Sequence, residues 1–237
     1  MTRPPEMTRS QPPRSTSAAR ATPLAALAAA ATLALVLAGC ASPQSTFYTL
    51  TDATGTTGTT GAANAGATTG AIAPAAPAAP YALEVSPVAV PEQVDRPQIV
   101  VTRGGGRVDI LEESRWSAPL KTELTSTISR DLTQRLGAMD VYGLPRADGL
   151  TVYRVSTSVQ RFESVPGEQA ALTAVWSVRK VPGDMVLTCR FAGTELASGG
   201  IAGVVSAQRK LVDRLADGIG NAIATSAQGT ATPRCPN

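Results

Sequence analysis

Hydrophobic residues between residues 81 and 225 recur with two different periods, and the period separates helices from strands. A spacing of three or four positions places apolar side chains on one face of a helix. Two such stripes are formed by Leu120, Leu124, Ile128, Leu132 and Leu136, and by Val204, Ala207, Leu211, Leu215, Ile219 and Ile223. We expect two amphipathic helices that bury these stripes in the core. Ser117 is the expected N-cap of the first helix, and Gly137 marks its end.

Segments rich in β-branched residues surround the two helices and predict strands. They cover residues 81–90, 98–102, 107–111, 150–165, 170–181 and 185–192. Gly104-Gly105-Gly106 lacks the Lys-Ser/Thr ending of a phosphate-binding loop, so it is interpreted as a hairpin turn. Short breaks at residues 166–167 and 182–183 imply antiparallel neighbours. The order of elements predicts an α+β fold, in which two amphipathic helices pack on one face of a mostly antiparallel sheet.

The composition changes sharply before residue 81. Between residues 51 and 80 nearly every residue is Thr, Gly, Ala or Pro, a composition that cannot bury enough apolar surface to offset its ordering entropy. We therefore expect residues 40–80 to form a disordered tether with a root-mean-square reach of roughly 35 Å. Residues 81–226 are enough for a single domain, and residues 227–237 form a C-terminal tail. O-glycosylation of the threonines is left open.

The first 39 residues have the organisation of an export signal. Arginines precede an apolar run over residues 23–38, which is shorter than the roughly 20 residues that suit a transmembrane helix. These arginines are Arg3, Arg9, Arg14 and Arg20. The run ends in Leu37-Ala38-Gly39-Cys40, which matches a bacterial lipobox. We predict that residues 1–39 are removed and that Cys40 becomes a lipidated N-terminus. The alternative is an ordinary secretory signal with an incidental cysteine.

The residues around Cys40 also predict where the protein resides. More than one acyl chain, such as palmitate added to a diacylglyceryl group, gives lasting membrane attachment. Ala41 and Ser42 follow Cys40, so no Asp stands at the second position to retain the protein at the inner membrane. The predicted location is therefore the periplasmic face of the outer membrane.

Charge excludes one class of partner. The whole chain has 21 basic and 18 acidic residues. Removal of the signal takes four arginines and Glu6 with it, which leaves 17 of each sign. A protein that binds nucleic acid is expected to carry a basic face, whereas the remaining charges of both signs are interspersed. We therefore expect no nucleic-acid partner.

Cysteine and histidine usage bears on redox and metal chemistry. Once Cys40 is lipidated, Cys189 and Cys235 remain, and the chain contains no histidine. An even pair of cysteines in an oxidising compartment is a disulfide candidate. Closing a loop of roughly 46 residues would stabilise the fold by roughly 4 kcal/mol in the chain-entropy model. Two unpaired thiols are the alternative, and no metal site or cofactor is expected.

The sequence offers no convincing catalytic group, so we predict that the protein is not an enzyme. Without histidine, a Ser or Cys nucleophile would need Lys or a carboxylate as its base. Ser117 and Lys121 have such a pair only in their spacing, and the apolar stripe leaves them on a solvated face. Glu112 and Glu113 are adjacent, so on a strand they point to opposite faces.

The stretch between Val90 and Leu120 is less generic. The run Val90-Pro91-Glu92-Gln93-Val94-Asp95-Arg96-Pro97-Gln98-Ile99-Val100-Val101 precedes Arg103, Glu112 and the run Arg115-Trp116-Ser117-Ala118-Pro119-Leu120. Near the predicted mature N-terminus, Phe47-Tyr48-Thr49-Leu50 adds an aromatic-Tyr-x-Leu run. With these residues the chain resembles the PqiC-like family of ABC-type transport auxiliary lipoproteins over about residues 40–224. It departs from the family in the long Thr/Gly/Ala insert.

The same block contains the candidate partner-interface residues. Pro91 and Pro97 restrict the backbone on either side of Asp95 and Arg96, which predicts an extended loop that holds a pair of opposite charges. Exposed Arg and aromatic residues carry much of the binding energy at interfaces. The candidates are Asp95, Arg96, Arg103, Arg115 and Trp116. For Arg115 and Trp116, capping and core packing at the helix start is an equally weighted interpretation.

The resemblance implies a non-catalytic outer-membrane lipoprotein subunit of an envelope transport system of the MCE/ABC type. Such a system moves lipids or other hydrophobic molecules between membranes, and the implied partner is an MCE-type transporter component. The alternative is an autonomous periplasmic lipoprotein that maintains the envelope or binds an apolar ligand. A homo-oligomeric collar around a partner's channel is a further hypothesis.

Overall fold

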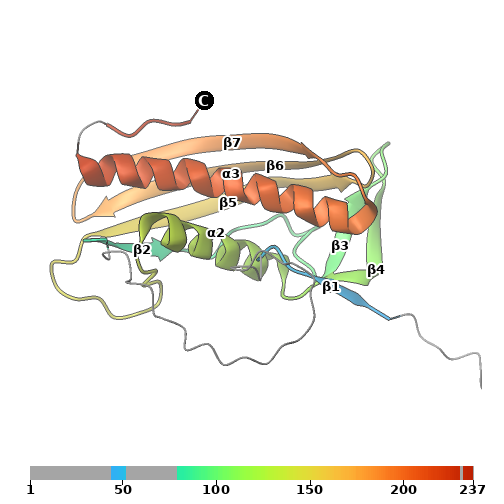
Figure 1. Ribbon diagram of the computed structural model, residues 1–237, viewed down its shortest axis with the longest axis horizontal. Coiled ribbons are helices and arrows are strands. Elements are labelled where there is room, and N and C mark those ends of the chain that lie inside the picture. Colours follow the sequence, from blue (N-terminus) through green and yellow to red (C-terminus); the bar gives the residue numbers. More distant parts are fainter. Residues whose placement is uncertain (1–43, 52–78, 230–231, 237) are drawn as a thin grey trace, which may run out of the picture. The chain divides into compact units, whose positions relative to one another are not determined.

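A four-stranded sheet in the order β2-β5-β6-β7 forms the centre of the structure (Figure 1). Its strands are β2 (Ala82–Val85), β5 (Val152–Val165), β6 (Gln169–Val181) and β7 (Val186–Leu196). The pairs β5–β6 and β6–β7 are antiparallel, because turns of a few residues connect them. Strand β2 pairs in parallel with β5, which the long intervening segment permits.

The computed structural model describes residues 44–51, 79–229 and 232–236, and these belong to one unit that begins at Gln44. The predicted signal over residues 1–39, the lipidation site Cys40 and the insert over residues 52–78 lie outside the described residues. None of the helices in the described part is long and apolar enough to cross a membrane.

A second sheet of three strands has the order β1-β4-β3. Strand β3 (Gln98–Thr102) and strand β4 (Val108–Trp116) form the expected antiparallel hairpin. Gly104, Gly105 and Gly106 all have positive φ, at 78°, 59° and 77°, so the turn requires residues without a Cβ. Strand β1 (Thr46–Tyr48) joins the far side of β4 in parallel, and it was not predicted as a strand.

Helices α2 (Leu120–Leu136) and α3 (Gly200–Gln228) lie side by side on the same face of the four-stranded sheet (Figure 1). The residue that precedes α2 is Pro119, and no side chain caps this helix end. The prediction of Ser117 as the N-cap is therefore wrong. Its hydroxyl instead donates a 2.6 Å hydrogen bond to Glu123 Oε1. Helix α2 ends at Gly137, whose φ of 60° is the left-handed conformation typical of a C-cap glycine.

Side chains from the two helices and the inner face of the sheet form the core. Along β6, Leu172, Ala174, Trp176 and Val178 alternate inward and are almost fully buried. Both predicted helix stripes belong to the same core, apart from Leu136, which is only partly buried. Gly193 on β7 allows α3 to approach, because a Cβ there would lie 2.9 Å from Leu211 Cδ2.

The predicted α+β class is confirmed, with a different arrangement of strands. The strands divide over two sheets, and each sheet contains one parallel pair. Strand β1 forms one parallel pair with β4, and strand β2 forms the other with β5. In each pair the two strands lie far apart in the sequence. Hairpin connections predict antiparallel neighbours well, but they carry no information on partners that are distant in sequence.

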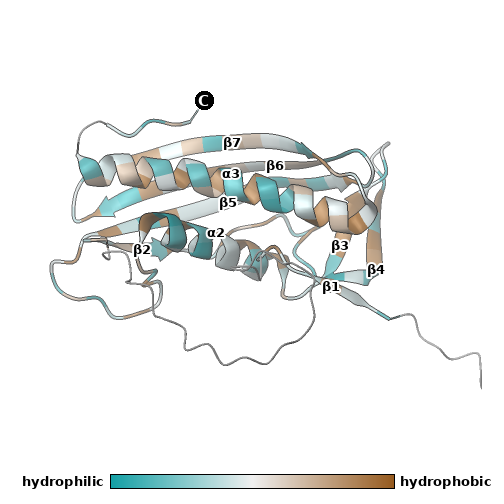
Figure 2. Cartoon of the chain, in the orientation of Figure 1, coloured by the Kyte–Doolittle hydropathy of each residue, from teal (hydrophilic) through white to brown (hydrophobic). Residues whose placement is uncertain are grey.

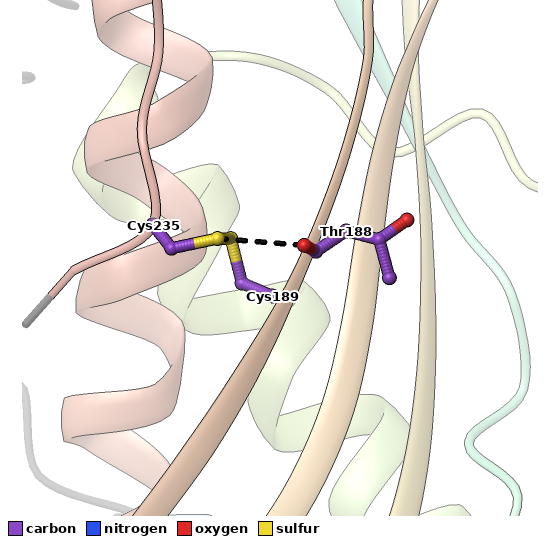
Figure 3. Close-up of a disulfide and its surroundings, with 3 residues drawn as sticks. All are labelled: Thr188, Cys189 and Cys235. Atoms are coloured by element: carbon purple, nitrogen blue, oxygen red, sulfur yellow. Dashed lines mark hydrogen bonds between the residues drawn. A yellow bond between two sulfur atoms is a disulfide. The ribbon is translucent and has the colours of Figure 1, made fainter.

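Cys189 and Cys235 form a disulfide that attaches the C-terminal tail to strand β7 (Figure 3). Their Cα atoms are 5.4 Å apart. The Cys189 side chain is buried on the face that carries the helices, next to Trp176 in the strand register. The Cys235 sulfur lies 3.4 Å from the Thr188 carbonyl oxygen. This contact is not a hydrogen bond, because a disulfide sulfur has no proton to donate.

The N-terminal segment belongs to the folded unit, which changes the predicted tether. The sequence predicts a tether over residues 40–80, but residues 44–51 pack against the rest of the chain and bury Leu50 completely. Beyond them, the insert begins next to Thr127, which contacts Thr51, and ends next to Gly137, whose carbonyl accepts a hydrogen bond from Ala79. These two attachment points are about 15 Å apart along α2, from the helical rise.

This geometry predicts that the insert can be shortened without loss of stability. Deleting residues 57–75 leaves enough chain to span about 15 Å, and the smaller loop should raise the free energy of unfolding by about 1 kcal/mol. Urea unfolding of the deletion variant and the wild type measures the difference. A loss of stability would show that the insert packs against the domain.

Candidate interaction site

Helix α2 carries a row of polar residues beside its apolar stripe. Glu123, Thr127 and Asp131 are spaced four residues apart, so they lie on one side of the helix, and each is at most 5% exposed. A buried carboxylate is costly unless charged or hydrogen-bonding groups surround it. This polar row therefore requires partners from another part of the chain.

The partner of Glu123 is the N-terminal segment. Its Oε2 atom accepts hydrogen bonds from the Thr49 hydroxyl at 2.8 Å and from the Leu50 backbone N–H at 2.9 Å. Its Oε1 atom accepts the Ser117 hydroxyl. The Ser117 backbone N–H in turn donates to the Tyr48 carbonyl at 2.8 Å. One carboxylate thus joins the N-terminal segment, the end of the hairpin and the first turn of α2.

The other two members of the row complete the attachment. The hydroxyl groups of Thr51 and Thr127 are 3.2 Å apart, and either can donate. From α3, Arg209 Nη1 donates to the Leu50 carbonyl at 2.6 Å, and Nη2 lies 3.2 Å from Asp131 Oδ1. We call the side chains that hold residues 48–51 the N-terminal clamp; they are Ser117, Glu123, Thr127, Asp131 and Arg209.

The clamp contains one carboxyl group with a shifted pKa. Burial, the largest effect, raises the pKa of Asp131. The positive charge of Arg209 opposes the rise, and Asp213 adds to it through its own charge and a hydrogen bond between the two carboxyl groups. Asp213 Oδ1 also lies 3.0 Å from Arg209 Nη2, so the two aspartates share one guanidinium.

A cleft of about 240 Å³ lies between the hairpin, strand β5 and the turn after Val90. Val94, Val100, Val108 and Phe162 supply apolar lining, while Arg161 and Glu163 add a charged pair. Figure 2 shows hydrophobic residues along β3 and the adjoining part of β4. Val108 is 55% exposed at the mouth of this hairpin cleft. The size and apolar lining of the hairpin cleft suit an apolar side chain of a partner.

Asp95 and Arg96 lie in a hydrogen-bonded turn, whereas the sequence predicts an extended loop. The N–H groups of Val94 and Asp95 both donate to the Pro91 carbonyl, because burial of Val94 draws the turn against the core. The Asp95 carboxylate lies 3.8 Å from Lys121 Nζ. Arg96 is half-buried, and its Nε atom makes no hydrogen bond within the described residues.

The remaining candidates are divided between the two ends of the hairpin. Arg115 lies opposite Gln98, at the end next to Arg96, and its Nε donates to the Glu112 carbonyl. Arg103 lies at the glycine turn and pairs with Asp109 at 2.7 Å. The structure therefore does not gather the candidate residues into one patch.

Trp116 packs inside the molecule. It is only 3% exposed, and its ring lies 6.3 Å from the ring of Phe162. Of the two interpretations left open by the sequence, the structure shows core packing. Trp116 supports the wall of the hairpin cleft and cannot itself reach a partner.

Ser117 and Lys121 are not assembled as a nucleophile and base. The Ser117 hydroxyl donates to Glu123, and the Lys121 ammonium faces Asp95. Among the described residues, no group of three or more acidic, cysteine or histidine side chains is placed to hold a metal ion. The arrangement of these polar groups attaches one segment to another.

The sequence pattern does not predict the N-terminal clamp, although it contains one signal for it. Glu123, Thr127 and Asp131 recur at the spacing of the leucine stripe and directly beside it. Such a row on the border of a core is expected to be solvated unless a segment covers it. The covering segment, residues 48–51, is separated from α2 by about 70 positions, so local patterns could not pair them.

Comparison with known proteins gives a family and a fold. The family model described as ABC-type transport auxiliary lipoprotein component matches residues 48–220, which confirms the resemblance. No curated protein matches the chain. A crystal structure of an uncharacterised protein shares 15% identity and a TM-score of 0.55, covering 76% of this chain and 99% of its own. Protein XCC0632 from Xanthomonas campestris shares 19% identity and a TM-score of 0.50, covering 63% and 88%. At these identities the likeness concerns the fold.

We expect Glu123→Ala to destabilise the protein by about 3 kcal/mol, because it leaves the buried Leu50 N–H without an acceptor. Glu123→Gln keeps one acceptor oxygen and should cost less. The control is Glu168→Ala, at an exposed position in the turn before β6. Urea unfolding measures all three variants, and equal losses for Glu123→Ala and the control would contradict the role of the clamp.

The raised pKa of Asp131 predicts a pH dependence of stability. The unfolded chain releases this proton near its ordinary pKa of 3.8, whereas the folded protein retains it to higher pH. Ionisation of Asp131 therefore opposes folding above the folded pKa, and that penalty disappears as pH falls toward the unfolded value.

Relative to Asp131→Asn, the wild type should gain stability as the pH is lowered from about 7 to about 4.5. Urea unfolding of both proteins at each pH measures the change. A difference between the two proteins that stays constant, or that shifts in favour of the variant at low pH, would contradict the prediction.

Proposed function

The chain belongs to the ABC-type transport auxiliary lipoprotein family, and from this premise we propose that it is a non-catalytic subunit of an envelope transport system. In this proposal Cys40 holds the protein on the periplasmic face of the outer membrane. The subunit docks onto an MCE-type component that moves lipids or other hydrophobic molecules between the membranes. The observation that carries the proposal is the family match, which extends from Tyr48 in the N-terminal strand into α3.

The structure supports an anchored docking role through the N-terminal clamp. Residues 1–39 are removed in this proposal, so the lipid on Cys40 lies six residues before Thr46, the first residue of β1. That distance is at most about 20 Å for an extended chain. The domain in this proposal comprises residues 44–51 together with residues 81–226, and the insert between them is a loop of the domain.

We place the docking surface at the hairpin cleft. It combines the exposed Val108 and the other apolar lining residues with the charged pair of Arg161 and Glu163. This mixture of an apolar centre and a charged rim is typical of protein interfaces. The candidates Asp95, Arg96, Arg103 and Arg115 lie outside the lining of the cleft, and buried Trp116 packs near Phe162, which is part of that lining.

The alternative function, an autonomous lipoprotein that carries an apolar ligand, fits the cleft less well. At about 240 Å³ the cleft is smaller than the roughly 300 to 1,000 Å³ of ordinary ligand sites. A side chain of a partner fits this volume better than a lipid with two acyl chains. A homo-oligomeric collar remains compatible with the docking role, and native mass spectrometry at high protein concentration tests it.

The experiment that tests the docking role is capture of partners from cells. Cells are crosslinked gently, the protein is isolated by a C-terminal tag, and co-isolated envelope proteins are quantified by mass spectrometry. We expect enrichment of an MCE-type component with the wild type and its loss with Cys40→Ala. Enrichment of no transporter component would favour the autonomous lipoprotein instead.

A matched pair of variants tests the surface. Val108→Asp places a charge at the mouth of the hairpin cleft and should lower the co-isolated MCE-type component at least tenfold. Val186→Asp is the control, because Val186 is likewise the first residue of a strand and is similarly exposed, at 58% against 55%. Equal effects of the two substitutions would exclude the hairpin cleft as the docking surface.

A further inference from the structure

Phe47 is an exposed aromatic residue on a rigidly held strand. It is 64% exposed, while its neighbour Tyr48 is partly buried and Leu50 is completely buried. Strand β1 pairs with β4, and the N-terminal clamp holds the residues that follow it. The phenyl ring therefore projects from a fixed position of the fold.

The chain between Cys40 and Phe47 is short compared with the domain that it anchors. Seven residues reach at most about 25 Å even when fully extended. Helix α3 alone has 29 residues, which corresponds to about 43 Å. A domain larger than its attachment cannot rotate freely above the membrane. The short connection keeps β1 within about 25 Å of the residue that carries the acyl chains.

The chemistry of this surface also fits a membrane interface. Residues 41–51 contain no charged side chain. In the strand register Phe47 lies opposite Arg115, and the neighbouring Ser45 hydroxyl donates to Glu113 at 3.1 Å. An aromatic ring next to an arginine suits the boundary between acyl chains and phosphate groups, where apolar and cationic groups both find partners.

We propose that strand β1 is a membrane-contact surface and that Phe47 inserts into the headgroup boundary of the bilayer that holds the lipid on Cys40. The proposal rests on the lipidation that belongs to the proposed function. Other exposed apolar residues, such as Met139 and Leu144 in the loop after α2, have no comparably short connection to the anchor. The result is a domain with a fixed orientation on the membrane.

Fluorescence quenching by lipid tests the contact. Phe47→Trp is prepared as the full lipidated protein and reconstituted into vesicles of phosphatidylethanolamine and phosphatidylglycerol with brominated acyl chains. The native Trp116 and Trp176 are 3% and 1% exposed, so they provide a protected background. The control is Tyr142→Trp, at a residue that is 48% exposed in the loop after α2.

We expect brominated lipid to quench about half of the fluorescence added by Phe47→Trp and almost none of that added by Tyr142→Trp. Quenching that is absent, or equal for the two variants, would overturn the proposal. Urea unfolding verifies that both variants keep the stability of the wild type. A third variant, Phe47→Tyr with Tyr48→Trp, moves the probe to the inward-facing neighbour and should be quenched less than Phe47→Trp.

The test separates this inference from the proposed function. The intact mass of the purified protein reports acylation of Cys40, and the capture experiment reports the transporter partner. Acylated protein that captures the partner but shows no selective quenching at residue 47 would overturn the membrane contact and leave the proposed function standing. Protein without acyl chains would instead contradict the anchor on which both proposals rely.

Discussion

The buried carboxylate of Glu123 is the interaction on which the arrangement of the N-terminal half depends. It accepts hydrogen bonds from Thr49, Leu50 and Ser117, and so joins β1, the exit of β4 and the first turn of α2. A carboxylate removed from water needs several hydrogen-bond donors at once. Its demand for partners therefore fixes the position of an N-terminal segment that is too short to hold its place by apolar burial alone.

This attachment gives the hairpin cleft and the anchor a defined relation. Strand β1 lies against β4, and β4 is one strand of the hairpin that lines the cleft. The lipid attachment proposed at Cys40 lies six residues before β1, so it acts on the same three-stranded sheet. Helix α3 completes the connection, because Arg209 holds the Leu50 carbonyl. A docking surface and a membrane surface on the same three-stranded sheet would allow the subunit to meet its partner at a fixed distance from the membrane.

The four-stranded sheet and helix α3 provide the rigid support for the three-stranded sheet. Gly193 permits close packing of α3 on β7, and the disulfide between Cys189 and Cys235 attaches the tail to the same strand. These features concern stability rather than recognition, because their groups are buried or engaged with one another. The family match covers both parts, since it extends from Tyr48 in β1 into α3.

Local patterns along the sequence determined both helices and the strands other than β1. The period of the leucines located both helices, and glycine and proline pairs located the turns, because these signals act over a few residues. The family resemblance was also available from the block between Val90 and Leu120. Only the tertiary structure decided that Thr49 and Leu50 dock on Glu123, that Trp116 is buried and that the strands form two sheets. These features join residues far apart in the chain, and their free energy comes from burial and hydrogen bonds that exist only when the distant segments meet.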